Sequence, residues 1–192
     1  MHALVLYAHP CPESFNAAVH DVVVDTLKGR GWTVDDCDLN AEAFDPILSR
    51  EGRRGYHTVP DNIAPVQSYV ERLRAAEALV MVFPVWNFGY PAILKGFLDR
   101  VFLPDVSFKL QNGAVYPGLT NIKKLAACTT YGGTRMRAFL AGDPPRKCVT
   151  RAVRYACGKP PTRYVALYDM NNNGPQRLNA HLETVRAEMQ AL

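Results

Sequence analysis

Three short segments of the sequence carry residue types that could bind a ligand. The first segment, residues 9–16, reads HPCPESFN and leads into a predicted helix at Ser14. Because the free amides and the positive dipole end of a helix attract anions, this segment could bind a phosphate, with His9 and Asn16 adding hydrogen bonds. The glycines of the dinucleotide and P-loop fingerprints are absent. Taken alone, the segment fits an ordinary serine-capped turn better than a phosphate site.

The second segment, residues 84–90, places three aromatic residues within five positions. They are Trp86, Phe88 and Tyr90, separated by Asn87 and Gly89. Neither strand nor helix periodicity requires this spacing, and aromatic faces at the end of a buried strand can pack against a planar ligand. The alternative is a hydrophobic loop packed on the sheet or on another subunit. The pattern favours the planar ligand.

The third segment, residues 129–133, ends in Gly132 and Gly133. Such a pair permits positive φ and close approach of the backbone to a ligand, although a plain turn fits equally well. Cys11 lies beside His9 near a helix N-terminus, where a thiol can become reactive. Prolines flank it, however, and no hydrolase signature surrounds it, so an incidental thiol is the better interpretation. The other histidines show no metal-ligand spacing, and we expect no metal site.

Length and composition limit the classes of protein to which the chain can belong. The 192 residues are 48% hydrophobic and 21% charged, which is typical of one globular domain spanning residues 1–192. A net charge of +4 is too small to indicate nucleic acid, but it leaves anionic small ligands open. The sequence has neither a membrane-spanning apolar run nor a signal peptide. Five cysteines without a C-x-x-C motif predict reduced thiols and a cytoplasmic protein.

The elements that must position the three segments follow from apolar patterning. Apolar or alternating runs predict strands at residues 3–8, 32–37, 78–83, 125–129 and 163–167. Helical spacing predicts helices at residues 14–28, 65–76, 91–103 and 175–192. Residues 40–62 show no clear element, and residues 105–121 predict a loop excursion or a hairpin.

Strands that alternate with helices indicate a doubly wound α/β domain. For five strands we expect the flavodoxin-like arrangement, a parallel sheet in the order 2-1-3-4-5 with helices on both faces. Ligands of such sheets bind outside the carboxyl ends of the strands. The three segments follow the first, third and fourth strands, so we expect them to converge.

Taken together, the three segments resemble a known family. The chain is similar to the flavodoxin-fold NAD(P)H:quinone oxidoreductases, the DT-diaphorase-like flavoproteins, which include small regulatory subunits of potassium-efflux systems. The matching runs are HP with SFN after the first strand, FPVWNFGYPAILKGFLDRVF at residues 83–102, and TTYGG at residues 129–133. The resemblance extends to about Gly133. The second segment and residues 106–124 also resemble FMN-dependent azoreductases.

The resemblance implies a flavin and a set of residues that hold it. His9, Ser14, Phe15 and Asn16 would bind its phosphate. The isoalloxazine ring and ribityl chain would lie against Pro84, Val85, Trp86, Asn87 and Phe88. The polar edge of the ring would meet Thr130, Tyr131, Gly132 and Gly133. Phe108 and Tyr131 would contact the substrate, and no residue is predicted to act as a catalytic acid or base, because the flavin performs the redox chemistry.

The resemblance also implies an activity, with open alternatives. It predicts a homodimer that transfers two electrons by a ping-pong mechanism from NADPH or NADH to a quinone-like acceptor. The alternatives are a flavin-binding regulatory module of a larger protein, an azoreductase or FMN reductase, and an electron carrier. FMN is favoured over FAD because the extended C-terminus of the animal enzymes is missing. The tyrosine and histidine that follow the glycine pair in those enzymes are missing too.

Two arginines stand where that tyrosine and histidine would be expected. Arg135 and Arg137 could stabilise an anionic flavin or bind a nicotinamide dinucleotide phosphate, and surface solvation explains them equally well.

Overall fold

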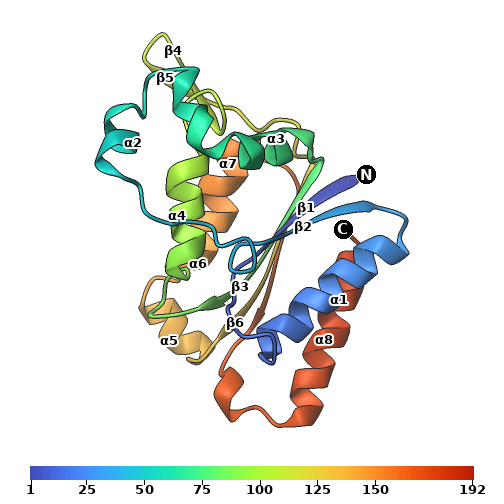
Figure 1. Cartoon of the computed structure of the whole chain (residues 1–192). Coiled ribbons are helices and arrows are strands. Elements are labelled where there is room, and N and C mark those ends of the chain that lie inside the picture. Colours follow the sequence, from blue (N-terminus) through green and yellow to red (C-terminus); the bar gives the residue numbers. More distant parts are fainter.

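The computed structural model describes residues 1–192 and contains a five-stranded parallel sheet (Figure 1). The strands lie in the order β2-β1-β3-β6-β7. Their bounds are β1 His2–Tyr7, β2 Thr33–Asp38, β3 Ala78–Val85, β6 Lys124–Tyr131 and β7 Thr162–Leu167. With the two strands of a separate hairpin set aside, this is the predicted order 2-1-3-4-5, so the predicted fold class is confirmed.

Helices cover both faces of the sheet (Figure 1). On one face α1 (Phe15–Gly29) and α8 (Pro175–Gln190) enclose a cluster of 17 buried residues. On the other face α3 (Gln67–Ala75), α4 (Ala92–Val101) and the π-helical segment η2 (Cys148–Val153) enclose a second cluster of 28. Since both faces are covered, every residue of β3 is buried, as parallel strands require.

The third strand extends beyond its predicted end. The apolar run stops before Pro84, but β3 continues to Val85 and pairs Pro84 with Thr130 of β6. The last bond from β1 to β3 runs from the Ala8 amide to the Val82 carbonyl. The backbone groups of residues 82 and 84 both point toward β1. Because the hydrogen bonds between β1 and β3 end at Val82, the missing amide hydrogen of Pro84 removes none of them.

Short elements fill the stretches without a clear periodicity. Residues 40–62 contain α2 (Arg50–Arg54) and the start of the 3-10 helix η1 (Asp61–Val66), so the helix predicted at 65–76 begins later, at Gln67. Between β6 and β7 lie α5 (Arg135–Leu140), α6 (Pro144–Lys147), η2 and α7 (Arg154–Ala156). Helices of three to six residues are too short to display a hydrophobic period.

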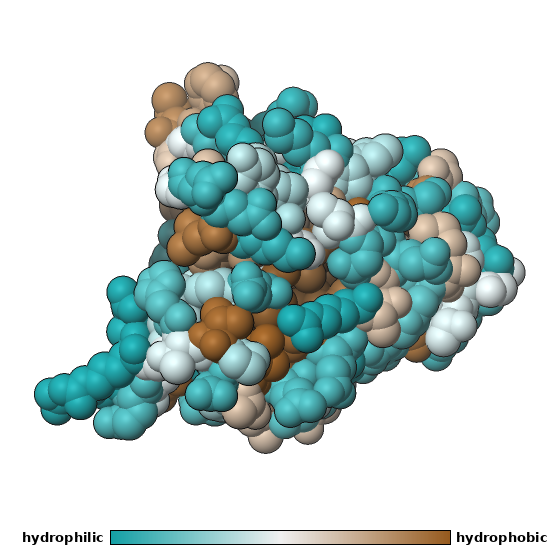
Figure 2. Space-filling view, turned by 90° about the horizontal axis from the view of Figure 1, so that it is seen from above, coloured by the Kyte–Doolittle hydropathy of each residue, from teal (hydrophilic) through white to brown (hydrophobic).

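The excursion at residues 105–121 contains an antiparallel hairpin, as one of the two sequence alternatives anticipated. It is formed by β4 (Phe108–Gln111) and β5 (Ala114–Pro117). The hairpin lies at the end of the molecule opposite the carboxyl ends of β1, β3 and β6 (Figure 1). Figure 2 looks onto this end and shows hydrophobic side chains in a hollow surrounded by hydrophilic segments. None of the helices has the length and apolar character needed to cross a bilayer.

Candidate functional site

The three segments meet at the carboxyl-terminal edge of the sheet. The Asn16 side chain donates from Nδ2 to Oγ1 of Thr130 at 2.7 Å, which joins the first segment to the third. The rings of His9 and Trp86 lie edge to face with centroids 5.6 Å apart, which joins the first to the second. The predicted convergence is therefore confirmed.

The start of α1 has the properties of an anion site. Ser14 caps the helix, and its hydroxyl oxygen accepts the amide hydrogen of Ala17 at 3.1 Å. The backbone amides of Phe15 and Asn16 donate to no protein acceptor, as is usual in a first helical turn. The side-chain oxygen Oδ1 of Asn16 is buried without a hydrogen-bond partner. The first turn contains no acidic residue, so free donors and the helix dipole face this edge unopposed.

The second segment exposes two aromatic side chains. The backbone amides and carbonyls of Trp86 and Gly89 bond reciprocally, at 2.8 and 3.3 Å, around a tight turn. Asn87 and Phe88 at its centre have φ values of +49° and +57°. The side chains of Trp86 and Phe88 are 45% and 38% exposed, whereas Tyr90 packs edge-on against Phe83 in the core. Two aromatic side chains are therefore exposed at the sheet edge where α1 begins, whereas the third packs into the core.

The third segment is mostly enclosed. The side chain of Tyr131 is 1% exposed, and its hydroxyl donates to Oδ1 of Asp143 at 2.7 Å. The hydroxyl of Tyr164 lies 2.7 Å away, and burial raises the pKa of Tyr131 above its ordinary value. The ring of Tyr131 thus belongs to the core and does not line the edge.

The glycine pair of the third segment has an ordinary backbone conformation. Neither Gly132 nor Gly133 has positive φ. The chain does not reverse here, because it runs directly into Thr134, which caps α5 by accepting the amide hydrogen of Arg137. A methyl group at Gly133 would make an ordinary contact, 3.8 Å from the ring of Phe88. The glycine pair therefore does not use the positive φ that it permits, but the third segment does lie against the second.

Phe108 is not brought to this edge within one chain. It lies in β4, on the hairpin at the opposite end of the sheet (Figure 1). A contact between Phe108 and a ligand at the three segments therefore requires a second copy of the chain.

Sequence reasoning missed a cavity of about 500 Å³ beside the first segment. His9 shares its lining with Tyr7 and Asn40, and the side-chain nitrogen of Asn40 is buried without a partner. The sequence could have indicated Asn40, because it follows the carboxyl end of β2 and therefore lies at the same sheet edge as the three segments. No such signal marked Tyr7, because it lies within the apolar run of the first strand.

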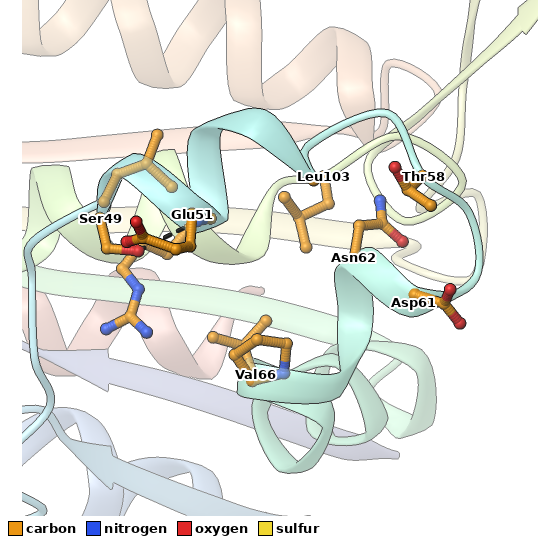
Figure 3. A pocket seen from close by; sticks show the side chains of 12 residues that line it. Ser49, Glu51, Thr58, Asp61, Asn62, Val66 and Leu103 are labelled. Carbon is orange, nitrogen blue, oxygen red and sulfur yellow. Dashed lines mark hydrogen bonds between the residues drawn. The ribbon is translucent and has the colours of Figure 1, made fainter.

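A separate cavity of about 380 Å³ is lined mostly by residues 48–62, for which almost no element was predicted. It is bounded by α2, η1 and the C-terminal end of α4. In Figure 3, Ser49 and Glu51 lie on one side of it, and Asn62 and Leu103 lie on the other. The Asn62 amide nitrogen donates to the carbonyls of Tyr56 and Pro104, which ties η1 to the segment before the hairpin. None of the three segments lines this cavity.

Comparison with known proteins agrees with this architecture. The chain is 34% identical over 157 residues to NAD(P)H dehydrogenase [quinone] 1 of Cavia porcellus, covering 73% of this chain and 56% of that one. It thus spans little more than half the length of this relative. An uncharacterized NAD(P)H oxidoreductase of Haemophilus influenzae is 26% identical, with 100% of this chain and 95% of that one covered.

A solved structure with FMN shares the fold. It is an FMN-dependent NADH-azoreductase from Bacillus anthracis, with a TM-score of 0.80 and 15% identity over 100% of this chain and 99% of that one. The family model for the flavodoxin-like fold matches residues 1–192. With that match, the sheet order and the converging segments in agreement, the chain belongs to the flavodoxin-like fold family.

Proposed function

We propose that this protein is a flavin-dependent NAD(P)H oxidoreductase that reduces quinones or similar acceptors by two electrons. One observation carries the proposal: the free amides of Phe15 and Asn16 lie at the same sheet edge as the exposed rings of Trp86 and Phe88. A phosphate and a planar ring in one ligand would satisfy both features. The similarity to quinone dehydrogenases and to an NAD(P)H oxidoreductase supports this choice.

The residues at this edge fit a flavin. Ser14 and the backbone amides of Phe15 and Asn16 would hold the phosphate. The unpartnered Oδ1 of Asn16 would accept a hydrogen bond from a hydroxyl group of the ligand and not from its phosphate. Pro84 to Phe88 would flank the ring system, and Thr130 to Gly133 would lie along its polar edge. When bound, a flavin supplies hydride acceptance and donation. The chain itself would orient the ring, shield one face from water with Trp86 and Phe88, and leave the other face for donor and acceptor in turn.

FMN is the proposed flavin. The azoreductase that shares this fold has been solved with FMN, which supports FMN over FAD. All five cysteines are free, which supports a reducing, cytoplasmic location.

The position of Phe108 supports a homodimer. Because the hairpin and the three segments lie at opposite ends of one chain, Phe108 could cover only the flavin of a second copy. A dimer by light scattering, together with a raised KM for the quinone in Phe108→Ala, is expected. A monomer with full activity would contradict this part of the proposal.

The decisive experiment first identifies the bound cofactor and then measures the oxidation of NADH and NADPH. The purified protein should be yellow, and heating should release FMN. Oxidation of NADH and NADPH is then compared with benzoquinone, an azo dye and free FMN as acceptors, which separates quinone reductase, azoreductase and FMN reductase. Protein that stays colourless after incubation with FMN and FAD would refute the proposal. Tight flavin binding without turnover would instead indicate a regulatory module.

A further inference from the structure

A basic pocket lies next to the third segment, between α5 and the α6–η2 helix. It has a volume of about 350 Å³ and is lined by four cationic residues, Arg135, Arg146, Lys147 and Arg151. All four are exposed, and none forms an ion pair. We call this the basic pocket.

The positive charge of the basic pocket is not neutralised from within. Asp143 is the one carboxylate in its lining, and it accepts the hydroxyl hydrogen of Tyr131 at 2.7 Å. Four cations therefore face one carboxylate, which is engaged by a core tyrosine. Crowded, unpaired cations in a concave site raise the local positive potential, and Arg guanidinium groups match the oxygens of a phosphate in pairs.

Aromatic side chains complete the lining. Phe139 of α5 is 74% exposed, and Tyr168 also lines the pocket. A phosphate flanked by aromatic faces suits a nucleotide, since the base can stack while the phosphate meets the cations.

The basic pocket lies next to the proposed flavin site. Arg135 follows Gly133 by two residues, and the amide of Asp169 donates to the Gly133 carbonyl at 2.9 Å. The neighbouring ring of Tyr168 lies 4.5 Å from that of Tyr131. A donor whose nicotinamide reaches the flavin edge would thus find the basic pocket along the same surface.

We propose that the basic pocket binds the phosphorylated adenosine end of the nicotinamide donor and selects NADPH over NADH. This inference rests on the proposed oxidoreductase function. The 2′-phosphate of NADPH, like other phosphomonoesters, carries about −1.5 to −2 charges at pH 7, which matches the excess of cations. The sequence directed attention to Arg135 and Arg137, but only Arg135 lines the pocket.

The test is the double variant Lys147→Gln/Arg151→Gln in the flavin-loaded protein. Both side chains are exposed, whereas Arg146 stacks on Tyr164, 5.2 Å from its ring centroid, and is left intact. The KM for NADPH should rise at least tenfold while kcat and the KM for NADH change less than twofold, because charge-assisted hydrogen bonds to the 2′-phosphate are lost. Lys28→Gln, an exposed position in the last turn of α1 outside the pocket, is the matched control and should leave both KM values unchanged.

A binding measurement separates failure of this inference from failure of the proposed function. Titration calorimetry with 2′,5′-ADP should show binding to the wild-type protein, weakened at least tenfold in the double variant, with much weaker binding of 5′-AMP. Equal KM shifts for NADH and NADPH, or no binding of 2′,5′-ADP, would overturn the inference even if NADH is oxidised. If neither nicotinamide is oxidised, the oxidoreductase proposal fails, and the 2′,5′-ADP titration still decides whether the pocket binds this phosphate.

Discussion

Replacing Thr130 by valine should weaken both the fold and flavin binding. The substitution keeps the shape of the side chain but removes Oγ1, which accepts the 2.7 Å bond from Asn16. Asn16 and Thr130 are only 2% and 3% exposed, so water cannot replace the lost acceptor. Leaving a buried donor unsatisfied costs about 1–3 kcal/mol. For a chain of this length that loss corresponds to a decrease in Tm of roughly 2–12 °C.

The flavin should dissociate more readily for the same reason. The bond fixes Asn16 at the start of α1, where its backbone amide is free to donate to the proposed phosphate. A loss of about 1.4 kcal/mol in this positioning raises the flavin Kd about tenfold. Urea unfolding of the flavin-free protein measures the stability, and quenching of flavin fluorescence measures the Kd. Thr184→Val is the matched control, because that exposed hydroxyl bonds only to a carbonyl of its own helix and should change stability by less than about 0.5 kcal/mol.

A double-mutant cycle tests whether the hydrogen bond between Asn16 and Thr130 has this role. Asn16→Ala and Thr130→Val should show a coupling of about 0.5–3 kcal/mol, because they remove the two ends of one bond. Additive effects of the two substitutions, or a Thr130→Val protein as stable as the wild type, would refute the assigned role of this bond.

Two further predictions concern packing and pH. Gly96→Ala should lower stability by about 1–3 kcal/mol in thermal unfolding, because the new Cβ would lie 2.3 Å from the carbonyl oxygen of Pro46. Gly29→Ala, where nothing lies within 4 Å, should be neutral or slightly stabilising, and equal losses in both variants would contradict this account. Burial lowers the pKa of His181 below its ordinary 6.5, so its contribution to stability is complete above that pH and declines as the pH falls through it. Urea unfolding across this range should show a shallower decline in His181→Leu, and an unchanged pH dependence would rule the residue out as a contributor.

Much of the fold was predictable because it depends on short-range patterns. The runs ALVLYA and ALVMVF are apolar on both sides of the strand, which indicates a sheet covered on both faces, and the alternation with helices leads to the observed order. The convergence of the three segments follows from that order, because parallel strands end at one edge. Ser14 as the helix cap also follows, since capping is a local interaction.

The details of the site depended on contacts between distant residues. The bond between Asn16 and Thr130 joins residues 114 positions apart, and no local pattern encodes it. The ring of Tyr131 turns into the core because Asp143 and Tyr164 offer polar partners there. The glycine pair permits a left-handed conformation but does not adopt it, because the chain proceeds straight into α5.

The sequence by itself therefore determined the sheet, its order and the edge at which a ligand would bind, because hydrophobic periodicity and the alternation of strands with helices can be read from local sequence. Only the tertiary structure decided which side chains stand at that edge, and that Phe108 lies at the other end of the chain. It also gathered Arg135, Arg146, Lys147 and Arg151 into one pocket. These cations come from short helices without a readable period, and their closeness arises from packing against β6 and β7, which no single segment specifies.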